Sequence, residues 1–159
     1  MPDCQHLLID GYNILHSWPA LKDFLPGNID IARDRLGDAV RIIHDYDGIR
    51  TTLIFDGRGR EIEVVRPSNE STFSFLYTPS GETADKIIEQ LVAKANKPQG
   101  IFVATRDNMI RETVRALGAQ TLSPEALVDW VHACERGQTE KLKRMNKSSD
   151  SLWRNRQDQ

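Results

Sequence analysis

Short apolar runs and helical stripes alternate along this chain. Short apolar runs bounded by turn residues predict buried strands, and β-branched residues strengthen that prediction at 50–57. The clear runs lie at 6–10, 50–57 and 101–105, and shorter strand candidates lie at 61–65, 72–77 and 119–122. The candidate at 61–65 alternates in polarity, as a half-exposed strand does.

Stripes of apolar residues spaced three and four apart predict helices. They cover about 29–43, 84–95, 108–117 and 127–134. Gly48 and Gly118 follow two of these stripes and act as stop signals. Between the first strand and the first long helix we expect irregular chain, with Tyr12 and Asn13 in a loop and a connection or short lid over 18–28.

Strands that alternate with helices indicate an α/β fold with a mainly parallel sheet, because parallel strands need crossover connections that cover both faces. The 159 residues, 39% hydrophobic and 28% charged, suffice for one compact domain with a buried core. In such a sheet the ligand crevice lies at the carboxyl ends of the strands, where the strand order reverses. Polar residues at those ends are therefore the first candidates for a functional site.

The chain changes character near its C-terminal end. Apolar residues become rare after Gly137. The first 135 residues carry 14 Lys/Arg against 20 Asp/Glu, whereas the rest carry 7 against 3. We expect a domain over 1–136 and a basic, mobile tail over 137–159, which either follows a phosphate backbone or simply stays solvated.

Three aspartates follow the three clear strands, and a fourth opens a helix. Asp10 ends the first strand, Asp56 the second, and Asp107 comes two residues after the third, so all three are expected at one edge of the sheet. Asp85 closes the turn Gly-Glu-Thr-Ala-Asp at 81–85, on the same side. An acid there is also an ordinary stabiliser of a helix start, because the helix dipole favours negative charge.

Four carboxylates in one crevice would repel one another, and burial would raise their pKa values, unless a cation compensated the charge. Mg²⁺ or Mn²⁺ suits such a set, because these hard cations prefer oxygen ligands and combine a few carboxylates with substrate phosphate oxygens. A site of this kind activates a water and stabilises the charge that develops during phosphodiester cleavage. The four acids therefore predict a divalent-metal site that acts on a phosphate ester.

Other features argue against alternative chemistry. Cys4 and Cys134 lack Cys-x-x-Cys or Cys/His spacing, so neither a disulfide framework nor a zinc site is indicated, and the four histidines have no ligand spacing. No apolar run approaches the roughly 20 residues that cross a bilayer, and the N-terminus lacks the order of a signal peptide. We expect a cytoplasmic protein with no membrane partner.

Several motifs together resemble the YacP-like NYN domains, which are ribosome-associated endoribonucleases within the wider PIN-like nuclease fold. The matching segments are 7–16, 18–19, 32–33, 55–57, 81–85, 88–89 and 103–107. The resemblance covers residues 6 to about 135, and Asp-Gly-Tyr-Asn together with Gly-Glu-Thr-Ala-Asp makes it fairly specific. Lys86 stands where such domains often carry a second acid, and Arg106 where they often carry serine. The missing acid is expected to weaken metal binding.

The resemblance implies a PIN-like three-layer α/β/α sandwich and metal-dependent cleavage of RNA. The catalytic positions that it implies are Asp10, Asn13, Asp56, Asp85 and Asp107. Within that set we expect Asp10, Asp85 and Asp107 to hold Mg²⁺ or Mn²⁺, Asp56 to assist from behind them, and Asn13 to position the phosphate. RNA is the partner that the resemblance implies, without identifying which one; we expect messenger RNA, with the ribosome as a further candidate.

Four more side chains are candidates for RNA contact: Arg33, Tyr12, Arg106 and Arg111. Arginine grips phosphates well, but a solvated or salt-bridged arginine is the ordinary case, and only Arg33 fits the family pattern. Tyr12 has the chemistry to stack on a base of single-stranded RNA. Asn13 has its own structural alternative, because asparagine after a strand commonly forms a turn.

The main hypothesis is a Mg²⁺- or Mn²⁺-dependent endoribonuclease in which water is the nucleophile. The alternative is a binding module that keeps the fold and docks on RNA or the ribosome without cutting. A phosphatase that works through a phosphoaspartate fits less well, because Asp10-Gly11-Tyr12 lacks the second acid that such sites place two residues on.

Overall fold

The computed structural model describes residues 3–157 and has a six-stranded sheet at its centre. The strands are β1 (His6–Asp10), β2 (Arg50–Phe55), β3 (Glu63–Val65), β4 (Phe73–Tyr77), β5 (Ile101–Ala104) and β6 (Gln120–Leu122). They lie in the order β3-β4-β2-β1-β5-β6, and every neighbouring pair is parallel except β3 with β4. The predicted α/β fold with a mainly parallel sheet is confirmed.

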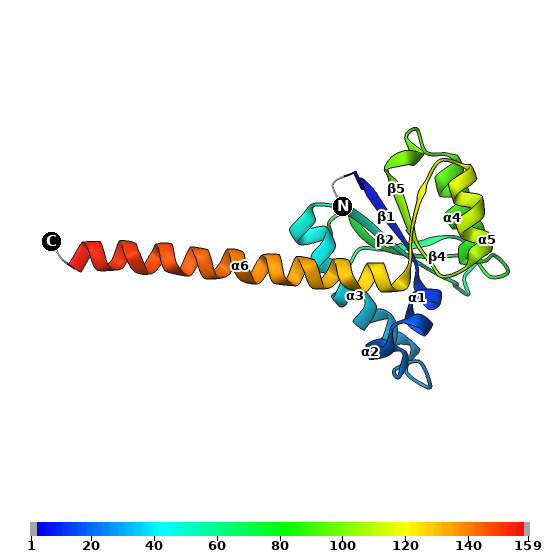
Figure 1. Ribbon diagram of the computed structural model, residues 1–159. Coiled ribbons are helices and arrows are strands. Elements are labelled where there is room, and N and C mark those ends of the chain that lie inside the picture. Colours follow the sequence, from blue (N-terminus) through cyan, green and yellow to red (C-terminus); the bar gives the residue numbers. More distant parts are fainter. Residues whose placement is uncertain (1–2, 158–159) are drawn as a thin grey trace.

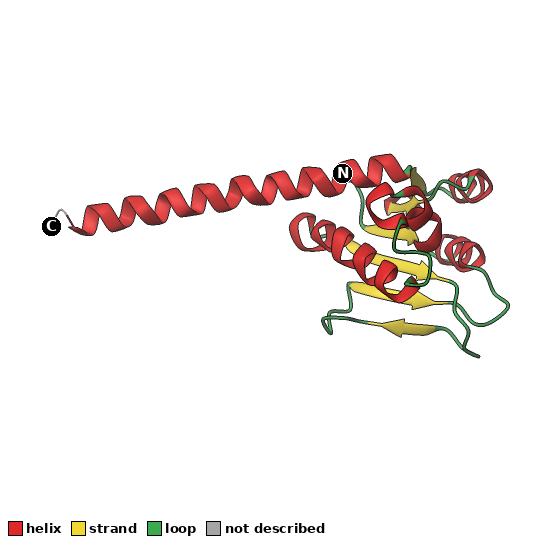
Figure 2. Ribbon diagram, turned by 90° about the horizontal axis from the view of Figure 1, so that it is seen from below, coloured by secondary structure: helices red, strands yellow, loops and turns green. Residues whose placement is uncertain are grey.

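Helices cover both faces of the sheet (Figures 1 and 2). They are α1 (Gly11–Ser17), α2 (Pro19–Lys22), α3 (Ile29–Asp47), α4 (Ala84–Ala93), α5 (Asn108–Ala116) and α6 (Pro124–Gln157), with a 3-10 turn at Pro98–Gly100. Leu7 and Ile9 of β1 pack into the core under α1, α2, α3 and α6, whereas Leu8 packs into the core under α4 and α5. Both faces of β1 are thus buried, which is why this strand reads as one apolar run.

The segment after β1 differs from the prediction. Tyr12 and Asn13, expected in a loop, lie in α1, and the short helix α2 lies within the stretch expected to be irregular. Ile14 and Leu15 are fully buried, and a Cβ at Gly11 would collide with the ring of Phe55. Close packing of this segment on β2 therefore decides its conformation, although glycine and asparagine on their own favour turns.

The last helix is longer than predicted. Helix α6 runs without a break from Pro124 to Gln157, so residues 137–157, which the sequence predicted as a mobile tail, continue a domain helix (Figure 1). Its first turns bury Leu127 and Val131, whereas every side chain over 138–153 is exposed. The side chains become exposed near the predicted boundary at residue 136, but the helix does not end there. Within residues 3–157, no helix combines the length and the apolar character needed to cross a membrane.

Candidate active site

Four aspartates surround the carboxyl ends of the central strands. Asp10 is the last residue of β1, Asp56 follows β2 directly, and Asp107 precedes α5 just after β5. Asp85 is the second residue of α4. The chain moves from one side of β1 to the other between β4 and β5, so the strand order reverses at this point of the sheet. This is the place where ligand crevices form in parallel sheets.

Asp10 is the most enclosed of the four, with 5% of its surface exposed. Burial raises its pKa to about 7, and the charges of Asp85, Asp107 and Asp56 add to that rise. The Thr105 hydroxyl donates a hydrogen bond of 2.9 Å to Asp10 Oδ2 and offsets part of it. The charges of the other three acids therefore act on Asp10, and the protein compensates the Asp10 charge only in part.

Asp56 and Asp107 each use one carboxylate oxygen to order a helix start. Asp107 Oδ1 accepts the backbone N–H groups of Met109, at 2.9 Å, and Ile110, at 3.4 Å, and so caps α5. Asp56 Oδ1 accepts the backbone N–H of Ala84 at 2.8 Å, at the start of α4. These bonds fix both carboxyl groups at the crevice. They also give each acid a structural role beside any role in metal binding.

Asp85 is a first-turn acid that does not cap its helix. The capping side chain is Thr83, whose hydroxyl accepts the backbone N–H of Lys86 at 3.3 Å. The pKa of Asp85 is raised by burial first, and then by the nearby charges of Asp107, Asp56 and Glu89. Partial burial among like charges is unfavourable for a residue with a purely structural role, so Asp85 belongs to the crevice.

Asn13 lies beside the acids and holds the loop that carries Asp107. Its Oδ1 accepts the backbone N–H of Arg106 at 2.7 Å and lies 3.3 Å from the Thr105 hydroxyl. The same hydroxyl accepts the backbone N–H of Asp107 at 3.1 Å. Because Asn13 sits in α1, one turn of helix and the 105–107 loop are locked together. The amide N–H groups of Asn13 are the donors that remain for a phosphate oxygen.

Two of the four RNA-contact candidates line a cleft next to the acids. The cleft has a volume of about 520 Å³, and Tyr12, Arg33, Asp56, Arg58 and Tyr77 are among its lining residues. Arg33 donates to the Tyr12 hydroxyl at 3.2 Å, and its guanidinium carbon lies 5.3 Å from the centre of the Tyr77 ring. Arg33 also forms an ion pair with Asp30, so this arginine is held in place before any ligand arrives.

The other two candidates are placed differently. The side chain of Arg106 forms an ion pair with Glu125 at the start of α6, although its backbone belongs to the crevice loop. Arg111 lies in α5, and its Nε is enclosed without a hydrogen-bond partner among residues 3–157. Arg106 is thus engaged by protein, and the crevice itself gains less positive charge than the sequence predicted.

The crevice fits a hard divalent cation in chemistry. Its donors are carboxylate oxygens, and burial together with the neighbouring acids raises the pKa values of Asp10 and Asp85, so holding these groups ionised has a cost that a bound cation would offset. No three of the four aspartates bring one oxygen each within 4.8 Å of one another. Such spacing suits Mg²⁺ or Mn²⁺ better than a cation that needs a closed protein cage, because Mg²⁺ keeps several waters.

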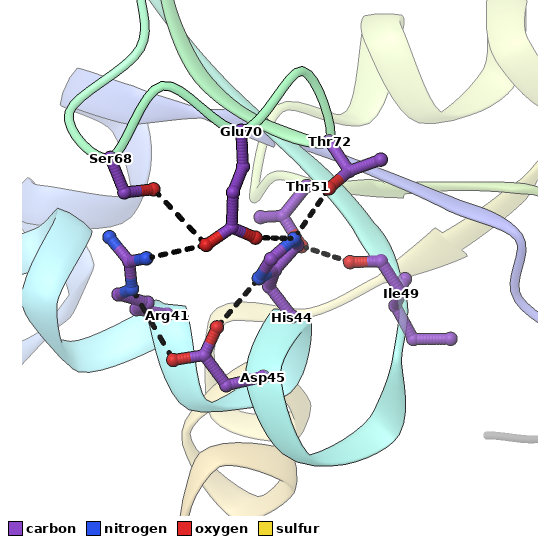
Figure 3. Close-up of polar contacts among 8 residues, drawn as sticks. All are labelled: Arg41, His44, Asp45, Ile49, Thr51, Ser68, Glu70 and Thr72. Carbon is purple, nitrogen blue, oxygen red and sulfur yellow. Dashed lines mark hydrogen bonds and ion pairs between the residues drawn. The ribbon is translucent and has the colours of Figure 1, made fainter.

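Within residues 3–157, the one tight group of possible metal ligands lies elsewhere. One ligand atom each of His44, Asp45 and Glu70 falls within 4.8 Å of the others. Arg41 lies between the acids, 3.3 Å from Asp45 and 3.4 Å from Glu70, and His44 is 2.7 Å from both Asp45 and the Thr72 hydroxyl (Figure 3). A bound cation would face the Arg41 charge, so we interpret this group as an ion-pair network that ties α3 to the loop before β4.

Sequence reasoning missed two residues of the crevice. Thr105 was seen only as the end of a strand, yet it is fully buried and bonds both Asp10 and the Asp107 backbone. Glu89 lies one turn after Asp85 and adds to its negative surroundings. The spacing of four between Asp85 and Glu89 could have revealed the second residue, because such positions share one face of a helix. For Thr105, the signal in the sequence was a polar β-branched residue at the end of a strand.

The fold and the acids at its strand ends define a domain of the NYN class, and comparison with known sequences identifies the family. The sequence profile of the YacP-like NYN domains matches residues 7–159, and the chain belongs to this family. It is 32% identical over 134 residues to the uncharacterized protein YacP of Bacillus subtilis (strain 168), across 82% of this chain and 76% of that protein. The expected family is thereby confirmed.

Solved structures agree with this assignment. The crystal structure of Rae1 (YacP) from Bacillus subtilis matches with a TM-score of 0.75 and 29% identity, over 92% of this chain and 84% of that one. Its W164L mutant matches with a TM-score of 0.74 and 29% identity, over 90% and 84%. Family membership suggests a nuclease-type hydrolase with an RNA substrate and a divalent-metal requirement.

Proposed function

We propose that this protein is a Mg²⁺- or Mn²⁺-dependent endoribonuclease, with messenger RNA as its substrate and the ribosome as a candidate partner. The observation that carries the proposal is the convergence of Asp10, Asp56, Asp85 and Asp107 on one crevice, where burial and mutual repulsion raise the pKa of Asp10 to about 7. A protein keeps like charges together at such cost where a ligand compensates them.

Each residue has a part in the proposed reaction. Asp10, Asp85 and Asp107 would hold the cation, which when bound supplies activation of a water and stabilisation of phosphate charge. Asp56, tied to the start of α4, orients that side of the crevice. Asn13 fixes the 105–107 loop with its oxygen and offers its amide N–H groups to a phosphate oxygen. Tyr12 and Arg33 would receive the neighbouring part of the RNA strand in the adjoining cleft.

A non-catalytic RNA- or ribosome-binding module is the second candidate. Lys86 and the engagement of Arg106 with Glu125 favour it, because the first leaves the crevice without a further acid and the second removes a cation from the substrate path. Both candidates share the fold and the RNA partner. They differ in whether the phosphodiester bond breaks.

The deciding experiment is cleavage of single-stranded and structured RNA by the purified protein in Mn²⁺, in Mg²⁺ and in EDTA. We expect cuts only with metal, and loss of those cuts in Asp10→Asn. Asp38→Asn is the matched control, because Asp38 is an exposed acid on α3 away from the crevice. RNA that stays intact under all conditions while still binding the parent protein would establish the binding module instead.

A further inference from the structure

The exposed half of α6 is the most unusual surface of the molecule. We call residues 138–157 the arm. The arm projects beyond the body of the domain, which covers only the first turns of this helix (Figure 1). All side chains from Gln138 to Trp153 are exposed. Only the first part of this helix packs on the domain. The exposed part either contacts a partner outside the domain or is a solvated extension.

The arm has two different faces. At 100° per residue, Lys143 and Lys147 lie on the outer side together with the acids Glu140 and Asp150, whereas Arg144 and Lys141 lie on the flank nearer the domain. Leu142 and Met145 lie on the opposite side, in line with the residues that α6 buries nearer its start. The apolar stripe thus continues the face that packs on the domain, and the basic residues are spread over the outer side and one flank of the arm. None of these basic residues has an acidic ion-pair partner among the described residues.

The charge of the arm is opposite to that of the body. The first 135 residues carry 20 Asp/Glu against 14 Lys/Arg, and four of those acids face the crevice. A polyanion such as RNA is repelled by that surface. The arm carries 6 Lys/Arg against 2 Asp/Glu. Because phosphate contacts by Lys and Arg supply most non-specific affinity for nucleic acids, the arm is where this chain can gain it.

The path of α6 sets the distance between the arm and the crevice. The helix starts beside the crevice loop, where Glu125 pairs with Arg106. It then crosses to the far end of α3, where the Trp130 indole donates to Asp47 at 2.6 Å. Asp47 ends α3 shortly before β2 begins, so α6 has by then reached the amino ends of the strands. At 1.5 Å per residue, Lys141 and Lys147 lie about 25 to 35 Å along the axis from the start of α6.

We propose that the arm is a second RNA-binding surface, which grips the phosphate backbone of an RNA segment other than the one in the crevice. This inference rests on the proposed function, because that function makes RNA the partner. A stacked tetranucleotide spans only about 10 Å and cannot occupy both places. The substrate is therefore a long or folded RNA that the arm holds while a separate segment enters the crevice.

The test compares two triple variants of the full chain with equal loss of charge. Lys141→Gln, Lys143→Gln and Lys147→Gln neutralise the arm, and glutamine has nearly the helix propensity of lysine, so α6 is retained. Lys22→Gln, Lys94→Gln and Lys97→Gln remove three exposed lysines from the body. Binding is measured by fluorescence anisotropy at several salt concentrations, with a folded RNA of transfer-RNA size and with a tetranucleotide.

The arm variant should bind the folded RNA roughly tenfold more weakly at low salt, and the slope of log K against log salt should fall by about 2. Its binding and cleavage of the tetranucleotide should equal the parent's, and the body variant should retain the parent's affinity for both. Equal losses in the two variants, or no loss in either, would overturn the proposal. A loss that accompanies dissociation of a dimer in sedimentation would assign the arm to pairing of two copies instead.

Failure of the proposed function gives a different result. A parent protein that binds the folded RNA through the arm but cuts no RNA in Mn²⁺ would refute the nuclease and leave the second binding surface standing. A parent protein that cuts the tetranucleotide, with an arm variant that binds folded RNA as tightly as the parent, would refute the arm and leave the nuclease standing.

Discussion

Two clusters of ionisable side chains lie at opposite ends of the sheet, and they differ in how their charges are compensated. At the carboxyl ends, the charged groups that act on Asp10 are all acidic, and the pKa values of Asp10 and Asp85 are raised. At the amino ends, Arg41 and His44 stand between Asp45 and Glu70, at ion-pair distance from both (Figure 3).

The second cluster meets the geometric rule for a metal centre, and the first does not. If the crevice binds the metal, as proposed, proximity of ligand atoms is a poor guide here, because a guanidinium group brings carboxylates together as well as a metal cation does. Uncompensated charge is the better guide. Side chains that repel one another in a partly buried crevice lower the stability of the empty protein, and a divalent cation would remove that cost.

The largest effect is expected from Asp85→Asn, which tests whether the crevice acids bind a divalent cation. We expect RNA cleavage to fall by roughly 100-fold or more, because asparagine keeps the shape of the side chain but lacks the charge that a hard cation needs. The metal-free variant should be as stable as the parent or slightly more so, because repulsion with Asp107 and Asp56 is relieved. Single-turnover cleavage in Mn²⁺ and thermal unfolding in EDTA measure the two effects.

Glu82→Gln is the matched control for Asp85→Asn, because Glu82 lies two residues before the start of α4, near the positive end of the helix dipole. If Asp85 were only a helix-start acid, Asp85→Asn would lower stability by roughly 0.3 to 1 kcal/mol and leave cleavage intact. A variant that melts lower than the parent and cuts at the parent's rate would return Asp85 to that role.

The next largest effect concerns Asp10 and pH. Its pKa is about 7 in the folded protein and near 3.8 in the unfolded chain, so between these values the folded state binds the proton more tightly. Stability due to this group therefore falls as pH rises through that window. In EDTA, Asp10→Asn should exceed the parent in unfolding free energy by a few kcal/mol at pH 8, and the difference should shrink toward pH 4.

The pH dependence of Asp10 has to be measured as a difference between Asp10→Asn and the parent, because His6 also changes its pKa on folding. Burial, and then the Arg50 charge, lower the pKa of His6 from 6.5 to about 4, so between these values the unfolded chain binds the proton more tightly. Stability due to His6 rises with pH over that range and masks the opposite trend of Asp10. The difference between Asp10→Asn and the parent cancels the His6 contribution. A difference that stays constant from pH 4 to pH 8 would mean that Asp10 does not titrate in this window.

Much of the fold could be predicted from the sequence, because buried parallel strands and amphipathic helices leave strong patterns. The strands that end at Asp10 and Phe55 and the helix that starts at Ala84 were predicted with nearly the right bounds. Helix α1 was missed, because its buried positions span barely two turns and its glycine and asparagine favour turns. The helical continuation over 137–157 was missed because it buries almost nothing, and burial is what makes a helix visible in sequence.

The site was predictable in part. Register of the strands brings Asp10 and Asp56 to one edge, and this follows from the strand pattern alone. The hydrogen bonds of Thr105 and Asn13 depend on how two distant segments meet, and no local pattern contains that information. The ion pair between Arg106 and Glu125 likewise joins residues that only the folded chain brings together.

Metal binding itself should give a smaller effect on stability. Mn²⁺ that binds only the folded state raises the unfolding free energy by mass action, by about 1 to 3 kcal/mol when its concentration exceeds Kd by 10- to 100-fold. Thermal melts with and without millimolar Mn²⁺ measure this gain. It should vanish in Asp10→Asn. An equal gain in that variant would place the bound metal outside the crevice.

The smallest effect is expected at the other end of the sheet, in Glu70→Gln. About half of the Glu70 side chain is exposed, so its ion pair with Arg41 is well solvated, and its loss should cost no more than about 1 kcal/mol of stability. The gain in melting temperature from Mn²⁺ and the rate of RNA cleavage should both equal the parent's, because Arg41 and not a metal compensates this cluster. Loss of the Mn²⁺ gain in Glu70→Gln, with the gain intact in Asp10→Asn, would reverse the assignment of the two clusters. It would then be the His44 cluster that binds metal, and the repulsion among the crevice acids would remain uncompensated.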